Sequence, residues 1–449
     1  MSLLDVAVSA VEQAMARGAS GAECTISEGD EFSVDVRMGE VETLKEAGSR
    51  AAGIRILKGQ CSGSSYTSDL SPDGIAKMVE AAFEISAITT GDPFAGMPDP
   101  ADLGTLDDDL QLFSDDIAGI PTERKIAMAK CAEAAALTFD PRITNSKGAS
   151  FDTYVGRRVF ANSLGFSGDY RNSYCSISVM PVARQADGDK MERDYWYSTS
   201  RRFAGLDEPE EVGRIAAERV IRRLGARKVE TQKVPVIFEP RTARSLFNHV
   251  FDAVDGRAIY RSASFLAGKL GLPVAAENVN LIDDGTIPGL IGTSPFDDEG
   301  VTSRRTVVIE NGVLRNYLLN SYAARKLKMR TTGNASRGVT GNAGISHGNL
   351  YLEKGQVSPE ELIRGVKNGL YVTELIGQGV NIVTGDYSRG AAGIWIKDGE
   401  LAFPVSEVTI ASTLQEMLQG ISGIANDLVF RGSLESPTLM IGEMTVGGR

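Results

Sequence analysis

The stretches TVVIENGVLRNYLL at residues 306–319 and GIWIKDGELAFPV at residues 393–405 decide the fold class of this chain. Each places a two-residue turn, Asn311-Gly312 or Asp398-Gly399, between runs rich in β-branched and aromatic residues. Both residues of such a turn adopt positive φ, which asparagine, aspartate and glycine tolerate best. Both stretches therefore predict β-hairpins and a β-rich second half of the chain.

Segments with helical periodicity alternate with these strands. Residues 242–256, TARSLFNHVFDAVDG, repeat apolar side chains every three or four positions, which predicts a helix with one buried face. Ser71-Pro72 predicts a helix start, because serine caps free amides and proline fits the first turn. The helices predicted in this way span residues 3–17, 72–87, 122–137, 208–224, 242–256, 358–369 and 411–425.

The remaining pattern predicts an α+β fold, with an N-terminal mixed α/β region followed by a β-rich C-terminal domain with a few helices. Strand-like runs occupy residues 32–59, and a strand-rich stretch with turns at NSKG (145–148) and NSLGFSGD (162–169) ends near Tyr197. A chain of 449 residues is long for a single core. The predicted units are an N-terminal α/β subdomain (1–110), a second α/β subdomain (115–226) and a β-rich domain (229–449), with a proline-containing loop at 91–119.

Composition restricts the cellular setting. No run reaches the 18–20 apolar residues that span a bilayer, so no membrane segment is predicted. Asp5 and Glu12 interrupt the apolar N-terminal stretch, which favours a first helix over a secretory signal. The four cysteines form no CxxC pair and indicate a reducing, cytoplasmic compartment.

The net charge argues against direct binding of nucleic acid. The formal charge is −12, whereas a nucleic-acid binder normally presents a clustered basic surface. The densest basic run, residues 219–228, closes an amphipathic helix, where cations complement the helix dipole.

No standard catalytic motif is present. The chain holds two histidines, His249 and His347, no HExxH, and no cysteine after Cys175. A zinc site made of His249, Asp252 and His347 is the minor alternative; the favoured interpretation places His249 on the polar face of its helix. GxSxG and GxxxxGK[ST] are absent, and the glycine-rich segment 332–344 is interpreted as an irregular loop rather than an anion site.

Two polar clusters stand out from this background, SPFDDEGVTSRR at 294–305 and TGDYSRGAAG at 384–393. Turn chemistry explains much of both, because Asp and Ser bond to their own backbone in turns. The alternative is a surface that binds substrate or a partner subunit through paired charges. The candidate residues for such a surface are Asp297, Glu299, Arg304, Asp386, Ser388 and Arg389.

Long stretches around these clusters resemble the TldD/PmbA family, in particular its PmbA branch, also called TldE. The resemblance is carried by residues 292–335, residues 370–411 and the closing MTVGG, and more weakly by residues 37–56 and 162–170. It implies a bacterial or archaeal cytosolic metallopeptidase system that acts on peptides and poorly folded chains. The family is also known under the name modulator of DNA gyrase.

The resemblance implies a metal motif that this chain lacks. The TldD branch carries an HExxxH helix and a C-terminal cysteine; here the matching helix is SLFNHVFDAVDG, and the C-terminal region reads FRGSLESPTLMI. Phe247 and Asn248 align with the His-Glu pair and Asp252 with the second histidine. The expectation is therefore no catalytic residue, no metal and no cofactor in this subunit, which would pair with a metal-bearing TldD-type partner. A homodimeric peptide-binding scaffold and a weak metallopeptidase remain the alternatives.

Overall fold

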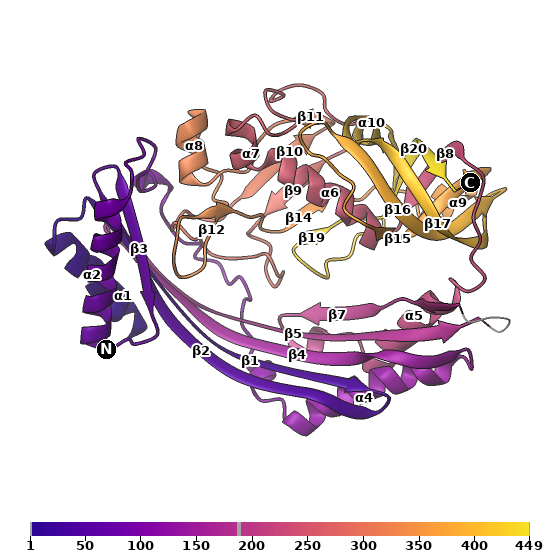
Figure 1. Cartoon of the computed structure of the whole chain (residues 1–449), viewed down its shortest axis with the longest axis horizontal. Coiled ribbons are helices and arrows are strands. Elements are labelled where there is room, and N and C mark those ends of the chain that lie inside the picture. Colours follow the sequence, from indigo (N-terminus) through magenta and orange to yellow (C-terminus); the bar gives the residue numbers. More distant parts are fainter. Residues whose placement is uncertain (1, 186–189, 449) are drawn as a thin grey trace.

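The fold is α+β, as predicted, in a computed structural model that describes residues 2–185 and 190–448. A long curved sheet forms the N-terminal half, and the C-terminal domain lies against its concave side (Figure 1). Within the described residues, no helix is both long and apolar to the degree that crossing a membrane requires.

The N-terminal sheet has the order β3-β2-β1-β4-β5-β6, with β7 also paired to β5. Because β1 pairs with β4 throughout, the strands of both predicted N-terminal subdomains share one sheet. The strands are β1 (Gly21–Arg37), β2 (Glu40–Lys58), β3 (Cys61–Thr67), β4 (Ile143–Asn162), β5 (Ser167–Arg184), β6 (Met191–Arg193) and β7 (Trp196–Ser200).

The strand-like runs predicted at residues 32–59 are β-structure, and Met38 and Gly39 turn the chain at positive φ between β1 and β2. The turn predicted at 145–148 is wrong, since β4 continues through it with a register irregularity between Ser146 and Ala149. The predicted turn at 162–169 is confirmed and joins β4 to β5.

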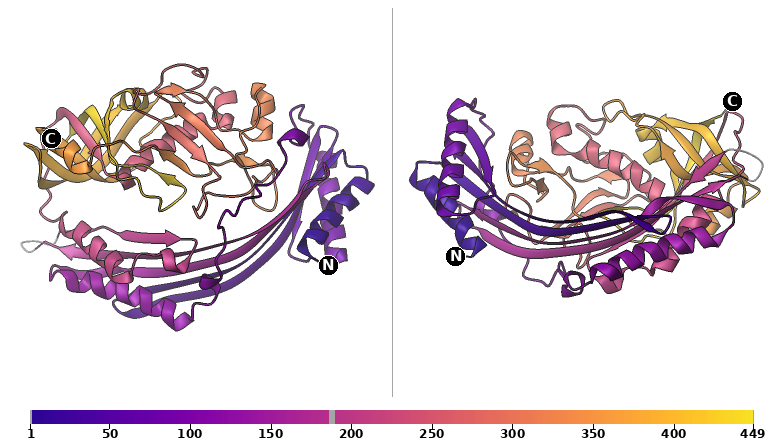
Figure 2. Two further views of the ribbon diagram at one scale, coloured as in Figure 1. Left: turned by 180° about the vertical axis from the view of Figure 1, so that it is seen from behind. Right: turned by 60° about the horizontal axis from the view of Figure 1, so that its bottom comes forward.

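Helices cover the convex face of the sheet at its two ends (Figure 2). Ile26 packs under α1 (Leu3–Ala16) and α2 (Pro72–Ile88), whereas Val34, on the same face of β1, packs under α4 (Thr122–Phe139) and α5 (Pro209–Ile221). Ser71 accepts the Gly74 N–H, as its capping role predicts. The connections contain the short helices η1 (Pro100–Asp102), α3 (Asp115–Ala118) and η2 (Phe203–Gly205).

The C-terminal domain packs three sheets around one core. A six-stranded sheet of order β17-β16-β15-β8-β20-β18 closes on itself through a β17–β20 pairing, beside a five-stranded sheet β11-β10-β9-β14-β19 and the pair β12-β13. The strands are β8 (Gln232–Phe238), β9 (Leu281–Asp284), β10 (Arg305–Glu310), β11 (Val313–Leu314), β12 (Ala335–Ser336), β13 (Gly344–Ile345), β14 (Leu350–Leu352), β15 (Asn368–Ile376), β16 (Asp386–Lys397), β17 (Glu400–Thr413), β18 (Ile421–Ile424), β19 (Leu434–Glu435) and β20 (Leu439–Gly447).

Both hairpins predicted from the sequence are confirmed, with all four turn residues at positive φ. The helix predicted at 242–256 corresponds to α6 (Pro240–Val254), followed by α7 (Gly256–Tyr260) and α8 (Ser321–Leu327). The helix predicted at 358–369 is shorter, α9 (Pro359–Arg364). The helix predicted at 411–425 is wrong: only α10 (Leu414–Gln419) is helical, because β17 runs to Thr413 and β18 follows Gly420.

Candidate functional site

A pocket of about 520 Å³, called here the α6 pocket, lies next to α6. It lies where α6, the start of β16 and the segment before β19 meet. Helix α6 contains the segment compared with the HExxxH motif, and β16 contains part of the second polar cluster. The fold therefore brings these two parts of the sequence together. The pocket is lined by Arg241, Arg244, Ser245, Asn248, His249, His347, Gln378, Arg389 and residues 432–434.

Helix α6 reaches the pocket with its polar face. Phe247 and Val250 are buried on the opposite side among the core residues of the C-terminal domain. Ser245 and His249, one turn apart, line the pocket, and Asn248 donates to the Asp252 carboxylate at 3.5 Å. Phe247, the position predicted from the resemblance to correspond to a metal ligand, therefore lies in the core and not in the pocket.

Both histidines of the chain line this pocket as neutral side chains. Burial and the nearby Arg389 guanidinium lower the pKa of His249, and burial lowers the pKa of His347. The His347 Nδ1 lies 3.0 Å from the Gly348 carbonyl oxygen, and its ring packs edge-on against Phe251. The Nε2 of His249 is buried and has no hydrogen-bond partner among the described residues.

Three arginines give the pocket its charge. Arg241 donates to the Asp194 carboxylate at 3.1 Å and to the Tyr195 carbonyl at 2.7 Å. Both contacts reach the segment next to β7, so Arg241 ties the pocket to the N-terminal sheet.

Of the other two arginines, Arg244 has a more distant acidic partner and Arg389 has none among the described residues. Arg244 donates to the Tyr197 hydroxyl at 2.7 Å and lies 3.6 Å from Glu435. Arg389 donates to the Ser245 hydroxyl at 2.7 Å, and no carboxylate of the described chain lies within ion-pair distance of it.

This donor set does not fit a metal ion. A hydrolytic zinc site needs three protein ligands, and the pocket offers two imidazoles without a lining carboxylate or thiol. Three guanidinium groups in the same wall would repel a cation. Across residues 2–185 and 190–448, no three His, Cys, Asp or Glu side chains are grouped closely enough to hold one, including the set His249, Asp252 and His347.

A second, smaller pocket of about 190 Å³ adjoins the first through His347 and lies against the concave face of the sheet. Asp283 on β9 lines it; one carboxylate oxygen accepts from the Asn334 amide, and the other is buried without a partner among the described residues. Burial raises the pKa of Asp283 to about 7. Asp297 and Arg304 also line this Asp283 pocket.

The candidates of the first polar cluster are mainly internal. Asp297 accepts N–H groups of Glu299, Val301 and Ala335, and burial together with Glu299 raises its pKa. Glu299 accepts the Ser321 N–H at the start of α8, and burial raises its pKa too. Arg304 lies 3.8 Å from Asp102. This cluster is organised by turn and helix-start hydrogen bonds.

The second cluster divides between the surface and the α6 pocket. Asp386 and Ser388 are exposed, and Asp386 accepts from the Thr384 hydroxyl at 2.5 Å. Only Arg389 reaches the α6 pocket. The six candidates therefore do not form one surface. The sequence analysis did not single out Arg241, Arg244 or Asp283, although Arg241 and Arg244 are three residues apart on a helix and share a face.

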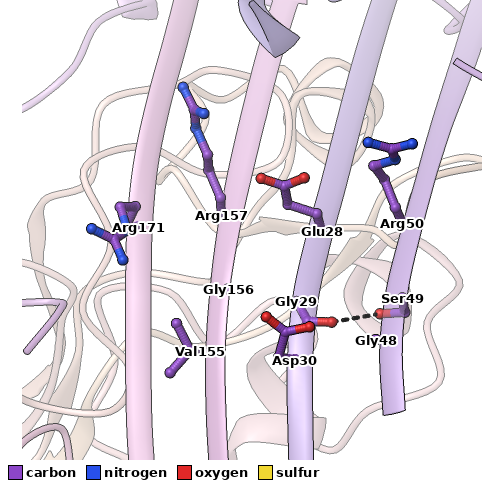
Figure 3. Close-up of a pocket in the computed structure, with 10 residues that line it drawn as sticks. All are labelled: Glu28, Gly29, Asp30, Gly48, Ser49, Arg50, Val155, Gly156, Arg157 and Arg171. Carbon is purple, nitrogen blue, oxygen red and sulfur yellow. Dashed lines mark hydrogen bonds between the residues drawn. The ribbon is translucent and has the colours of Figure 1, made fainter. Parts of the chain in front are cut away.

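A third hollow, of about 690 Å³, lies on the convex face of the sheet (Figure 3). Its side chains come from adjacent strands in one cross-strand row, Arg50, Glu28, Arg157 and Arg171. Glu28 lies on the same face of β1 as Ile26 and Val34, between the two helix-covered ends of the sheet. The hollow is therefore the uncovered middle of the sheet.

Comparison with known proteins assigns the family. The PmbA/TldA metallopeptidase models match residues 22–86 (domain 1), 115–224 (central domain) and 231–448 (C-terminal domain). Metalloprotease PmbA of Escherichia coli O157:H7 is 38% identical over 447 residues, which cover 100% of this chain and 96% of that one. The chain belongs to the PmbA/TldD family of metallopeptidases.

Further relatives agree along the full length. The metalloprotease PmbA homologue of Haemophilus influenzae is 38% identical and aligns with 98% of this chain and 94% of its own. The crystal structure of a proposed modulator of DNA gyrase from Bacteroides thetaiotaomicron superposes with a TM-score of 0.92 at 26% identity, covering 99% of this chain and 98% of that chain.

Proposed function

We propose that the chain is a metal-free accessory subunit of a peptidase of the PmbA/TldD type. It would pair with a metal-bearing TldD-type subunit, and the assembly would act on peptides or unfolded chains. The observation that carries this proposal is the α6 pocket, in which Arg241, Arg244 and Arg389 surround two neutral histidines.

The chemical reason is the missing nucleophile. In a metallopeptidase the ion lowers the pKa of a bound water, so that hydroxide is available near neutral pH. The absence of a lining carboxylate or thiol and the presence of three arginines in the α6 pocket support the proposal that this chain does not bind such an ion. A partner that brings the ion would supply the water, and this chain would contribute walls and substrate contacts.

Residues near the pocket are suited to that supporting role. In the proposal, segments 292–305 and 385–393 line the cleavage chamber or the subunit interface. Asp386 and Ser388 are exposed there, and Arg389 reaches the pocket wall. Exposed polar groups on a strand can hold an extended peptide backbone through hydrogen bonds.

Three measurements on the purified full-length chain test the proposal. The first is metal content after dialysis against zinc, the second is cleavage of unfolded casein by the chain alone, and the third is cleavage after a TldD-type subunit is added. We expect no stoichiometric metal, negligible cleavage alone, and cleavage by the mixture that a chelator abolishes.

Each alternative function predicts a different result. Stoichiometric zinc with cleavage by the isolated chain, lost in a His249→Gln/His347→Gln variant, would establish a weak metallopeptidase. A stable homodimer that binds casein, and neither joins a TldD-type subunit nor increases its cleavage, would establish a scaffold. Either result would overturn the accessory-subunit proposal.

A further inference from the structure

The α6 pocket has an electrostatic character opposite to that of the whole molecule. The chain carries a formal charge of −12, yet the pocket wall contains three arginines and no carboxylate. Arg241 and Arg244 each have an acidic group nearby, Asp194 at 3.1 Å and Glu435 at 3.6 Å. The Arg389 guanidinium has no such partner among the described residues, so the pocket keeps at least one uncompensated positive charge.

Several hydrogen-bonding groups of the pocket are also unused. The Nε atoms of Arg241 and Arg389 and the Nε2 of His249 are buried without a partner in the described chain. A buried donor without an acceptor costs free energy, and native proteins normally satisfy such groups with protein, water or ligand. Arg389 and His249 line the same cavity, so an acceptor-rich ligand there would lie beside both side chains.

The position of Arg389 is fixed before any ligand arrives. Its guanidinium donates to the Ser245 hydroxyl at 2.7 Å, and Ser245 stands on α6, whose opposite face is in the core. Tyr387, two residues earlier on β16, is buried and packs edge-on toward His249. A preorganised guanidinium loses little side-chain entropy on binding, which favours affinity.

We infer that the α6 pocket binds a carboxylate group of a peptide, with Arg389 as the principal anion-binding residue and His249 as an additional contact through its unpartnered Nε2. A carboxylate offers two coplanar oxygens that match the donor geometry of a guanidinium. The inference rests on the proposed function in one respect, because it takes the carboxylate to belong to a peptide.

Two kinds of peptide carboxylate share this chemistry, the free C-terminus and an Asp or Glu side chain. Three octapeptides of alanine and serine, labelled at the N-terminus with an uncharged BODIPY dye, separate them: one with a free C-terminus, one with a C-terminal amide, and one amide with a central glutamate. Binding to the full-length chain is followed by fluorescence anisotropy at low ionic strength. We expect the free acid or the glutamate peptide to bind at least about tenfold more tightly than the neutral amide, as loss of a charged hydrogen bond predicts.

Variants of Arg389 identify the residue responsible. Arg389→Gln is expected to abolish the preference for the carboxylate peptide. Arg389→Lys keeps the positive charge but cannot bind both carboxylate oxygens through a planar guanidinium, so it should retain part of the preference. The matched control is Arg315→Gln, on the β10–β11 hairpin, whose exposed guanidinium pairs with Glu310 and lies outside the pocket. Thermal unfolding of each variant confirms that the comparison is made between folded proteins.

The outcomes are decisive in both directions. Equal affinity for all three peptides, no measurable binding of any of them, or an undiminished preference in folded Arg389→Gln overturns the inference. Cleavage by the mixture with a TldD-type subunit does not enter this measurement. If that cleavage fails while the carboxylate preference persists, the proposed function falls and the binding site stands; the converse result removes only the site.

Discussion

At the scale of single residues, Asp297 of the first polar cluster holds its loop together through buried hydrogen bonds, whereas the exposed Asp386 of the second cluster does not. Asp297 accepts three backbone N–H groups from inside its own loop and from β12. Its side chain is 7% exposed, so water cannot replace these bonds. Asp386 in the second cluster accepts only a neighbouring hydroxyl at the surface.

We therefore expect Asp297→Ala to lower the free energy of unfolding by about 2–4 kcal/mol, because it leaves buried N–H groups without acceptors. Asp386→Ala is the matched control and should change it by less than about 0.5 kcal/mol. Urea denaturation followed by circular dichroism measures both. Equal effects of the two substitutions would show that the loop does not depend on the Asp297 carboxylate.

Asp283 gives the stability of the chain a pH dependence whose sign can be predicted. Its pKa in the folded chain is about 7 because of burial, against 3.8 for the unperturbed group. Between these values the folded state binds more protons than the unfolded state. The free energy of unfolding therefore falls as pH rises from about 4 to 7, and the loss is complete above the folded pKa.

Asparagine cannot ionise and should remove this contribution. We expect Asp283→Asn to gain stability relative to the parent chain by about 2–3 kcal/mol between pH 5 and pH 8. Urea denaturation at pH 5, 6, 7 and 8 gives the two profiles. If they run parallel, the Asp283 carboxyl does not titrate in this range.

At the scale of elements, the hairpin turns show where local sequence is sufficient. Asn311-Gly312 and Asp398-Gly399 were identified from residue types alone, and all four residues adopt the required positive φ. Short-range turn chemistry determined the outcome, so no tertiary information was needed. The capped start of α2 at Ser71 was predictable for the same reason.

The helix predicted at 411–425 shows where local sequence is insufficient. Ile421 and Ile424 are three residues apart, a spacing that favours one face of a helix; a strand can bury both here because its pairing with β20 is irregular between Ile421 and Gly423. In the fold residues 421–424 pair with β20 and bury Ile421 and Ile424, so a partner strand that follows later in the chain decides the structure. A short apolar run cannot distinguish these outcomes without that partner.

The turn of the β10–β11 hairpin allows a stability test with an internal control. Gly312 has a φ of 75°, which is unfavourable for a residue with a side chain. A Cβ added at this position would lie 2.4 Å from the Ala275 carbonyl oxygen. Gly39, in the β1–β2 turn, has a similar φ of 81° but nothing within 4 Å. The two glycines therefore separate backbone strain from steric overlap.

We expect Gly39→Ala to cost about 1–2 kcal/mol from backbone strain alone. Gly312→Ala should cost about 2–5 kcal/mol, because overlap adds to the same strain. Urea denaturation of both variants gives the comparison. A Gly312→Ala variant as stable as Gly39→Ala would mean that the turn moves away from residues 275–276 without penalty.

At the scale of the whole molecule, the candidate site could be predicted only in part. The sequence showed that imidazole and thiol ligands were scarce, and it singled out Arg389, but it distributed the candidates over two clusters. The α6 pocket joins segments around residues 245, 347, 389 and 433, which become neighbours only when the sheets of the C-terminal domain close. Because these contacts join distant parts of the chain, no local sequence pattern predicts which residues line the pocket.

The two halves of the molecule are joined by a buried ion cluster. Arg219 on α5 pairs with Glu239, which directly precedes α6, and lies 3.4 Å from Asp194. The side chains of Glu239 and Asp194 are nearly inaccessible, at 4% and 2% exposure. Because Arg241 of the α6 pocket shares Asp194, the cluster also positions one wall of that pocket.

Removing Arg219 should be costly because it leaves buried carboxylates undercompensated. We expect Arg219→Met to lower the free energy of unfolding by about 3–5 kcal/mol. Arg214→Met on the same helix, whose pairs with Glu211 and Glu218 are solvent-exposed, should lose much less stability. Adding Glu239→Gln to Arg219→Met should recover part of the loss, since the neutral amide costs less to bury. Urea denaturation of the three variants decides the point: if Arg219→Met is as stable as Arg214→Met, the cluster does not hold the two halves together.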